Sequence, residues 1–225
     1  MQDILLNFFN LDIYRQVWPL LMRGLGMTVL LSLLVIPLGL AFGLALAVLY
    51  TNVRSRLLKA LLAVYIDVFR AVPPLVLLIV IYFGFPFLDL DIPKVMAVVL
   101  CFTLNNSCYY GEVFRAGLES LPKGQAEAAR STGLSFMQSL RYVQIPQAAR
   151  NVLPDLISNS LEVIKLTTIA SAVALPELLQ VARNAQSVLY NPSPIVFAAL
   201  LYLALLIPLV RLMSRLERRR LSARH

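Results

Sequence analysis

A long uncharged stretch constrains the fold of this chain more than any other feature of its sequence. Residues 24–50, GLGMTVLLSLLVIPLGLAFGLALAVLY, contain no Asp, Glu, Lys or Arg. A helix of roughly 20 apolar residues crosses the ~30 Å hydrocarbon core of a bilayer, so this stretch is long enough to span a membrane. Charged residues make up only 14% of the chain, whereas a soluble domain carries about 25%. The sequence therefore predicts an all-α integral membrane protein.

Further apolar stretches predict a single domain built as a bundle of five transmembrane helices. The predicted spans are residues 24–50, 61–87, 95–114, 152–175 and 195–213. Residues 1–23 precede them and place Trp18 between Arg15 and Arg23, which predicts a short interfacial helix lying on the membrane. Residues 115–150 form a polar loop, and residues 214–225 form a basic tail.

The distribution of basic residues predicts the orientation of this bundle. Loop 51–59, polar loop 115–150 and tail 214–225 fall on one side and carry most of the Lys and Arg residues. Cytoplasmic loops are enriched in these residues, so this side is predicted to be cytoplasmic and the N-terminus to lie outside. The same rule accounts for the net charge of +8, so we expect no nucleic-acid partner.

Several kinds of site are excluded by composition. The two cysteines, Cys101 and Cys108, lie in one apolar stretch, and the single histidine, His225, is the last residue. Two thiols are too few for a tetrahedral zinc site, and a terminal histidine is a poor basis for catalysis. The N-terminal residues lack the pattern of a removable signal peptide. No GxxxxGK[ST] motif for binding ATP is present. We therefore expect neither an enzyme nor a cofactor bound by this chain.

Eight polar residues inside the predicted spans are candidates for a substrate pathway. Asp67 with Arg70, and Glu162 with Lys165, are acid–base pairs three residues apart, so each pair lies on one helix face. Charges in a bilayer usually face a bundle interior or an aqueous cavity. These pairs either neutralise each other for structural reasons or line a path for a zwitterionic substrate. The neutral candidates either bind substrate or hold helices together: Asn105, Asn106, Thr167 and Thr168.

Glycines and prolines predict local packing and breaks. Gly39 and Gly43 predict a face where another helix approaches closely. Pro73 and Pro74 remove two backbone donors, so the second span is expected to kink or unwind there. Glu112 and Arg115 are three residues apart at the edge of the polar loop, and we interpret them as an interfacial ion pair of little energetic weight.

The polar loop is predicted to contain two short helices. Residues 125–132 form the first, which Gly133 ends by adopting a left-handed conformation. Ser135 caps a second helix that runs to about Gln144, and Pro146 marks its end or a kink. From the residues alone, a rigid docking knob and an ordinary cytoplasmic loop are equally good interpretations.

Residues 127–146, EAARSTGLSFMQSLRYVQIP, resemble the EAA loop of ABC-importer permeases. That motif reads Glu-Ala-Ala, three residues, Gly, nine residues, then Ile-x-Leu-Pro. It is matched here, with two aliphatic exchanges, by Glu127, Ala128, Ala129, Gly133, Val143, Ile145 and Pro146. The flanking EVFRAGLESLPKGQAEAA and the segment FRAVPPLVLLIVIYFG resemble the polar amino acid subfamily, the histidine- and glutamine-type permeases.

This resemblance implies a type I importer-like transmembrane subunit in a bacterial inner membrane, in which residues 115–150 are the coupling loop. It implies a separate ABC ATP-binding subunit that carries ATP and Mg²⁺, a second permease chain, identical or a sister, and an extracytoplasmic substrate-binding protein. The alternative is a secondary transporter or channel driven by an ion gradient, with Asp67 and Glu162 as ion sites. Membrane lipid is a further expected partner, because Arg218, Arg219 and Arg220 either bind anionic headgroups or only anchor the topology.

Overall fold

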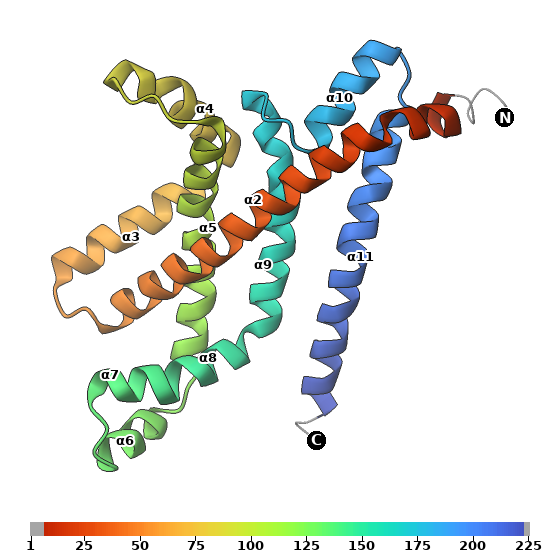
Figure 1. The fold of residues 1–225 in the computed structure, drawn as a ribbon. Helices are drawn as coiled ribbons and strands as arrows, with labels where there is room; N and C mark the ends of the chain where they lie inside the picture. Colours follow the sequence, from red (N-terminus) through yellow and green to blue (C-terminus); the bar gives the residue numbers. More distant parts are fainter. Residues whose placement is uncertain (1–6, 223–225) are drawn as a thin grey trace. The chain divides into compact units, whose positions relative to one another are not determined.

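The structure, a computed structural model, describes the backbone of residues 7–222 and the side chains of residues 7–215. All regular elements in this range are helical, as expected (Figure 1). They are α2 (Leu11–Asn52), α3 (Arg56–Ala71), α4 (Pro74–Gly84), the 3-10 helix η1 (Phe85–Leu88), α5 (Lys94–Glu119), α6 (Lys123–Ser131), α7 (Phe136–Ser139), the π-helix η2 (Leu140–Gln144), α8 (Ile145–Asn151), α9 (Leu153–Leu166), the 3-10 helix η3 (Thr167–Val173), α10 (Leu178–Leu189) and α11 (Ser193–Ser222).

The described residues contain fewer clear membrane spans than the five predicted. Three segments are long and apolar enough to cross a membrane: Leu11–Asn52, Leu153–Val173 and Ser193–Arg215. The bent pair Arg56–Ala71 and Pro74–Leu88 makes a fourth if it is counted as one span. α5, which covers predicted span 95–114, is long enough with its 26 residues but is not among these apolar segments.

Helix boundaries differ from the prediction at both ends of the first and last spans. The predicted interfacial helix 1–23 is not separate, because α2 runs without interruption from Leu11 to Asn52, and residues 1–6 lie outside the described part. Gly24 does not end the helix. A Cβ atom there would lie 3.0 Å from the Leu178 Cα atom, so the glycine serves close packing against α10. In the basic tail 214–225, α11 continues to Ser222, and the side chains from residue 216 on lie outside the described part.

Contact clustering divides the chain into two compact units. The first unit contains the described residues up to Ile36, Pro73–Phe102 and the chain from Leu161 onward. The second unit contains Pro37–Val72 and Thr103–Ser160. The polar loop therefore belongs wholly to the second unit.

In the first unit, α10 lies within residues 176–194, between the fourth and fifth predicted spans. The helix begins because Glu177 caps it: its fully buried carboxylate accepts hydrogen bonds from the backbone N–H groups of Leu179 (2.9 Å) and Gln180 (2.7 Å). Tyr202 of α11 donates a further hydrogen bond to this carboxylate at 3.1 Å. Burial raises the pKa of Glu177 above its usual value, because this effect outweighs the lowering by the two backbone donors. A buried acid with three donors is a cap that hydropathy alone does not reveal.

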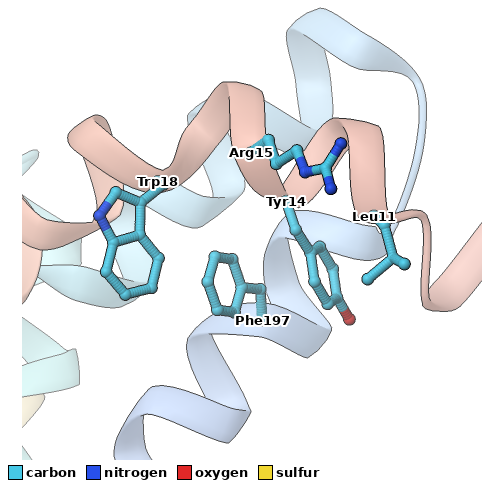
Figure 2. A pocket seen from close by; sticks show the side chains of 5 residues that line it. All are labelled: Leu11, Tyr14, Arg15, Trp18 and Phe197. Carbon is cyan, nitrogen blue, oxygen red and sulfur yellow. The ribbon is translucent and has the colours of Figure 1, made fainter.

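Aromatic residues join the start of α2 to the start of α11 within the first unit. The Phe197 ring stacks on the Tyr14 ring at a centroid distance of 4.5 Å and on the Trp18 ring at 5.7 Å. Figure 2 shows these rings side by side with Arg15 and Leu11 around an open pocket. Tyr and Trp favour the membrane–water interface, and the interfacial placement of this end of α2 stays a prediction.

In the second unit, the predicted glycine face of α2 packs against α5. A Cβ atom at Gly43 would lie 2.5 Å from the Tyr110 Cβ atom, and one at Gly39 would lie 3.0 Å from the Tyr110 ring. The Tyr110 hydroxyl is hydrogen-bonded to the Ser160 hydroxyl at 2.8 Å. The two glycines therefore allow α5 to approach α2 closely, as predicted.

The break predicted at Pro73–Pro74 is present, since α3 ends at Ala71 and α4 begins at Pro74. Proline at residue 73 cannot donate the helical hydrogen bond to the Phe69 carbonyl. The Asn105 side chain of α5 donates to this carbonyl instead, at 2.7 Å. A polar side chain thus satisfies the backbone group that the break leaves without its helical partner.

Candidate coupling loop and polar residues of the spans

The first helix of the polar loop, α6, ends at the glycine that the sequence singled out. Gly133 has φ +86°, in the left-handed region. Its N–H donates to the Arg130 carbonyl at 3.0 Å, and the Leu134 N–H donates to the Ala129 carbonyl at 3.3 Å. These two bonds form a Schellman motif, which satisfies carbonyl groups at the helix end. The predicted helix end is therefore confirmed.

Gly133 is expected to tolerate asparagine but not valine. A Cβ atom at this position would meet nothing within 4 Å, so neighbouring atoms leave room for a side chain. Glycine is favoured here because of the left-handed backbone conformation alone. Asparagine adopts the left-handed region far more readily than a β-branched residue does. We expect Gly133→Val to reduce uptake strongly and Gly133→Asn to retain most of it, measured at equal amounts of chain in the membrane. Equal loss in both variants would contradict this conformational account.

The second helical stretch begins as predicted and continues further than predicted. The Ser135 hydroxyl accepts a hydrogen bond from the Gln138 N–H at 3.3 Å, and the Gln138 side chain accepts one from the Ser135 N–H at 2.8 Å, which is a capping box. The helix does not stop or break at Pro146. A π-helical turn, in which the Ile145 N–H donates to the Leu140 carbonyl, precedes the proline and accommodates its missing donor.

Side-chain and backbone contacts fix the two helical stretches relative to each other and to α5. The Gln147 side chain of α8 donates to the Gln125 side chain of α6 at 3.2 Å. A Cβ atom at Gly117 of α5 would lie 3.0 Å from the Ala148 carbonyl oxygen, so α8 also packs tightly on α5. A groove lies beside these contacts, lined by Leu118, Glu119, Leu121, Pro122, Lys123, Gln125, Ala126 and Gln144. The loop is thus a packed structure and not a slack connection.

The seven motif residues divide between the surface and the interior of this loop. Glu127 and Ala128 are exposed on α6, whereas Ala129, the next residue, is buried. Gly133 and Pro146 are exposed, and Val143 and Ile145 are half-buried. The exposed Glu-Ala pair is therefore free to contact another protein, while Ala129 packs α6 onto the rest of the loop.

Three large apolar side chains on the loop surface were not among the predicted site residues. Phe136, Met137 and Tyr142 are 44%, 63% and 64% exposed. They lie on α7 and the π-helical turn, beside the capping box. Their signal in the sequence is the presence of large apolar residues in a segment that is otherwise polar. Exposed apolar groups of this size on a polar loop are typical of a protein–protein contact.

The candidate pathway residues carry charge pairs that partly differ from those predicted. Glu162 and Lys165 form the predicted ion pair, and both side chains are exposed. Arg70 instead contacts Glu112, with 3.7 Å between the Arg70 Nη1 and Glu112 Oε2 atoms. Asp67 is exposed, and within the described residues it forms no ion pair with Arg70. The predicted Asp67–Arg70 pair is therefore wrong.

The four neutral candidates are mostly engaged with backbone groups. Asn105 and Asn106 are buried in the second unit, and the Asn105 side chain donates a hydrogen bond to the Phe69 carbonyl. Thr167 is fully buried in the first unit and donates to the Ile164 carbonyl at 2.7 Å. Thr168 donates to the Lys165 carbonyl at 2.8 Å. These contacts stabilise the helices locally, as polar residues in membrane helices commonly do.

The predicted ion pair between Glu112 and Arg115 is part of a larger network. The Arg115 Nε and Nη2 atoms lie 3.1 and 2.6 Å from the two carboxylate oxygens of Glu112, and Nη1 lies 3.2 Å from both carboxylate oxygens of Glu119. Hydrogen bonding to Glu112 raises the pKa of the Arg115 guanidinium. A two-pronged contact of this kind is stronger and more directional than the surface pair that the sequence suggested. Within the described residues, no group of side chains is arranged to hold a metal ion.

Comparison with known proteins gives a consistent result. Residues 36–222 match the family described as "Binding-protein-dependent transport system inner membrane component". A probable amino-acid ABC transporter permease protein of Bacillus subtilis (strain 168), YckA, is 36% identical over 78% of this chain and 77% of its own length. A probable glutamine ABC transporter permease protein of the same organism, GlnP, is 34% identical over 86% of this chain and 90% of its own length.

Solved structures share the fold. A chain from a crystal structure of an amino acid ABC transporter with histidines superposes with a TM-score of 0.81 at 35% identity, covering 91% of this chain and 95% of that chain. A chain of the MetNI methionine ABC transporter superposes with a TM-score of 0.77 at 21% identity, covering 91% and 97%, and shares the fold. The family match, the relatives and the packed loop agree: this chain belongs to the family of binding-protein-dependent transport system inner membrane components.

Proposed function

We propose that this chain is the transmembrane subunit of an ATP-driven importer for amino acids or amino-acid-like compounds. Its relatives are permease proteins whose names specify amino acids, glutamine among them. The observation that carries the proposal is the loop: a Schellman motif and a capping box hold Glu127 and Ala128 exposed on a packed surface. Such a surface can receive movement from another protein as a rigid body.

The proposal assigns ATP and Mg²⁺ to a separate ATPase subunit that docks on this loop. Glu127 and Ala128 form the polar part of the docking surface, and Phe136, Met137 and Tyr142 form its apolar part. The other motif residues keep these two parts in position relative to each other: Ala129, Gly133, Val143, Ile145 and Pro146. An extracytoplasmic substrate-binding protein delivers the substrate, in line with the family description. A second permease chain, identical or a sister, completes the proposed assembly.

We also propose that α5 crosses the membrane, which gives five spans with the N-terminus outside. α5 has 26 residues and is therefore about 39 Å long, enough to cross. Its hydropathy is lowered by Asn105, Asn106 and Ser107, all of which are buried and so do not face lipid. The loop and the basic tail then lie on the cytoplasmic side, where the ATPase must be.

For the substrate pathway, the exposed Glu162–Lys165 pair is the better-supported candidate. Its carboxylate and ammonium groups are both exposed, which suits the ammonium and carboxylate of a zwitterionic substrate. Asp67 is also exposed and stays a candidate. Arg70, which contacts Glu112, is assigned to positioning of the helices, as are the buried residues Asn105, Asn106 and Thr167. Thr168 stays a candidate beside Lys165.

Reconstitution tests this function and separates it from gradient-driven transport. The chain is co-expressed with candidate ABC ATPase and substrate-binding proteins of the same organism, and uptake of radiolabelled glutamine and other amino acids is measured in proteoliposomes. We expect co-purification of the ATPase and accumulation of an amino acid only when ATP and binding protein are present. Uptake that follows a proton or sodium gradient without ATP would replace this proposal with that of a secondary transporter.

A further inference from the structure

One face of α5 holds the C-terminal turn of α3, where the second predicted span breaks. Asn105, Tyr109 and Glu112 are spaced at i, i+4 and i+7, which places them on one side of the helix. Asn105 donates to the Phe69 carbonyl at 2.7 Å. The Tyr109 ring lies beneath the Arg70 guanidinium at 5.5 Å, and Glu112 approaches the same guanidinium at 3.7 Å. All these contacts lie within the second unit.

The contacts of this face differ greatly in strength. The Asn105 hydrogen bond is buried, and it satisfies a carbonyl that Pro73 cannot serve, so losing it would leave a buried polar group without a partner. The Arg70–Glu112 contact is longer, and the Arg70 side chain is 42% exposed. Exposed pairs of this kind contribute little to stability. This ion pair can therefore open while both helices stay folded.

Glu112 also belongs to the end of α5 that leads into the coupling loop. Arg115 binds both Glu112 and Glu119, which fixes the last two turns of α5 directly before the turn to α6. The Arg115 guanidinium and the Lys59 ammonium both lie over the Tyr50 ring, at 5.7 and 4.9 Å. The end of α5 thus also contacts the last turn of α2, on which the first turn of α3 packs through Lys59.

We propose that Glu112 is a positioning residue that transmits movement of the loop to the broken end of α3 through its contact with Arg70. The proposal rests on the proposed function, because it needs an ATPase that moves the loop. Displacement of the loop carries the fixed end of α5 with it. The Arg70–Glu112 contact then passes this displacement to α3, one residue before the helix ends at Ala71. The hydrogen bond from the Asn105 side chain to the Phe69 carbonyl meanwhile keeps the end of α3 attached to α5.

The test compares variants of Arg70 in the reconstituted transporter. Arg70→Gln removes the charge that Glu112 contacts and leaves the Glu112–Arg115–Glu119 contacts within α5 in place. Arg70→Lys keeps the charge. Arg15→Gln is the matched control, since it removes an exposed arginine that pairs with Asp12 at 4.0 Å in the first unit. The measurements are the amount of ATPase co-purified, the ATP hydrolysed and the substrate taken up per ATP.

We expect Arg70→Gln to retain ATPase binding and hydrolysis but to lower uptake per ATP about tenfold, a change within the range of allosteric coupling. Arg70→Lys should recover most of the loss, and Arg15→Gln should behave as wild type. Wild-type uptake per ATP in Arg70→Gln would overturn the proposal. So would loss of the Arg70→Gln chain from the membrane, because the contact would then be structural. Failure of the wild-type chain to bind an ATPase would instead overturn the proposed function.

Discussion

Replacing Gly43 with alanine is expected to destabilise the second unit by about 2 kcal/mol or more, which is the range for overpacking a tight contact. The new Cβ atom would lie 2.5 Å from the Tyr110 Cβ atom, 2.9 Å from the Gly111 nitrogen and 3.0 Å from the Ser107 carbonyl oxygen. Two of these atoms are backbone, and the third is fixed to it, so no side-chain rotation relieves the contact. The helices α2 and α5 must separate to admit one methyl group. Thermal unfolding of the purified chain in detergent measures the effect.

Two other glycines of α2 provide matched controls for this prediction. Gly39→Ala meets only the Tyr110 ring, at 3.0 and 3.1 Å, and the Asn106 Cβ atom, at 3.7 Å, so a small movement of that ring admits it at a lower cost. Gly26→Ala meets nothing within 4 Å, and it should raise stability slightly because alanine is about 1 kcal/mol more favourable than glycine within a helix. We expect the melting temperature to fall in the order Gly26→Ala, Gly39→Ala, Gly43→Ala. Equal melting temperatures for all three would contradict the packing described for α2 and α5.

Reversing the charge of Glu127 is expected to abolish uptake without unfolding the chain. Glu127 is exposed on α6, and among the described residues its carboxylate forms no ion pair, so its replacement should change stability by no more than about 0.5 kcal/mol. Under the proposed function Glu127 contacts the ATPase, where a like charge in place of an opposite one costs several kcal/mol. Glu127→Lys should therefore reach the membrane in normal amounts and co-purify little ATPase.

The control for this charge reversal is Asp91→Lys. Asp91 is also exposed and undergoes the same change in charge, but it lies between η1 and α5, away from the loop in sequence. We expect this variant to keep its ATPase and its uptake. Loss of ATPase from both variants would show that the change in net charge, and not the position of Glu127, is responsible.

The loop was the part of the chain most fully predictable from sequence. Its helix ends depend on local chemistry: Gly133 supplies a left-handed residue, and Ser135 and Gln138 cap each other across three residues. Such contacts join neighbours in sequence and can be recognised from spacing. Pro146 was predicted to end or kink the helix. The helix continues because a π-helical turn absorbs the missing donor, and no residue pattern reports that turn.

Contacts between residues far apart in sequence account for the remaining errors. Arg70 was paired with Asp67 because they share a helix face, but the structure pairs it with Glu112, which α5 brings to the end of α3. α10 was not predicted, and its cap, Glu177, accepts a hydrogen bond from Tyr202 of the distant helix α11. Gly24 lies inside α2, where α10 packs closely against it. Each of these outcomes depends on a partner that helical periodicity cannot identify.

In the proposed function, an ATPase drives transport by binding the loop at Glu127. The most direct measurement is amino-acid uptake by proteoliposomes that contain equal amounts of wild-type or Glu127→Lys chain, with the ATPase and binding protein present and ATP supplied or withheld. The account predicts accumulation by the wild-type chain with ATP, none without it, and background uptake by Glu127→Lys under both conditions. Wild-type accumulation without ATP, or normal ATP-driven uptake by Glu127→Lys, would contradict it.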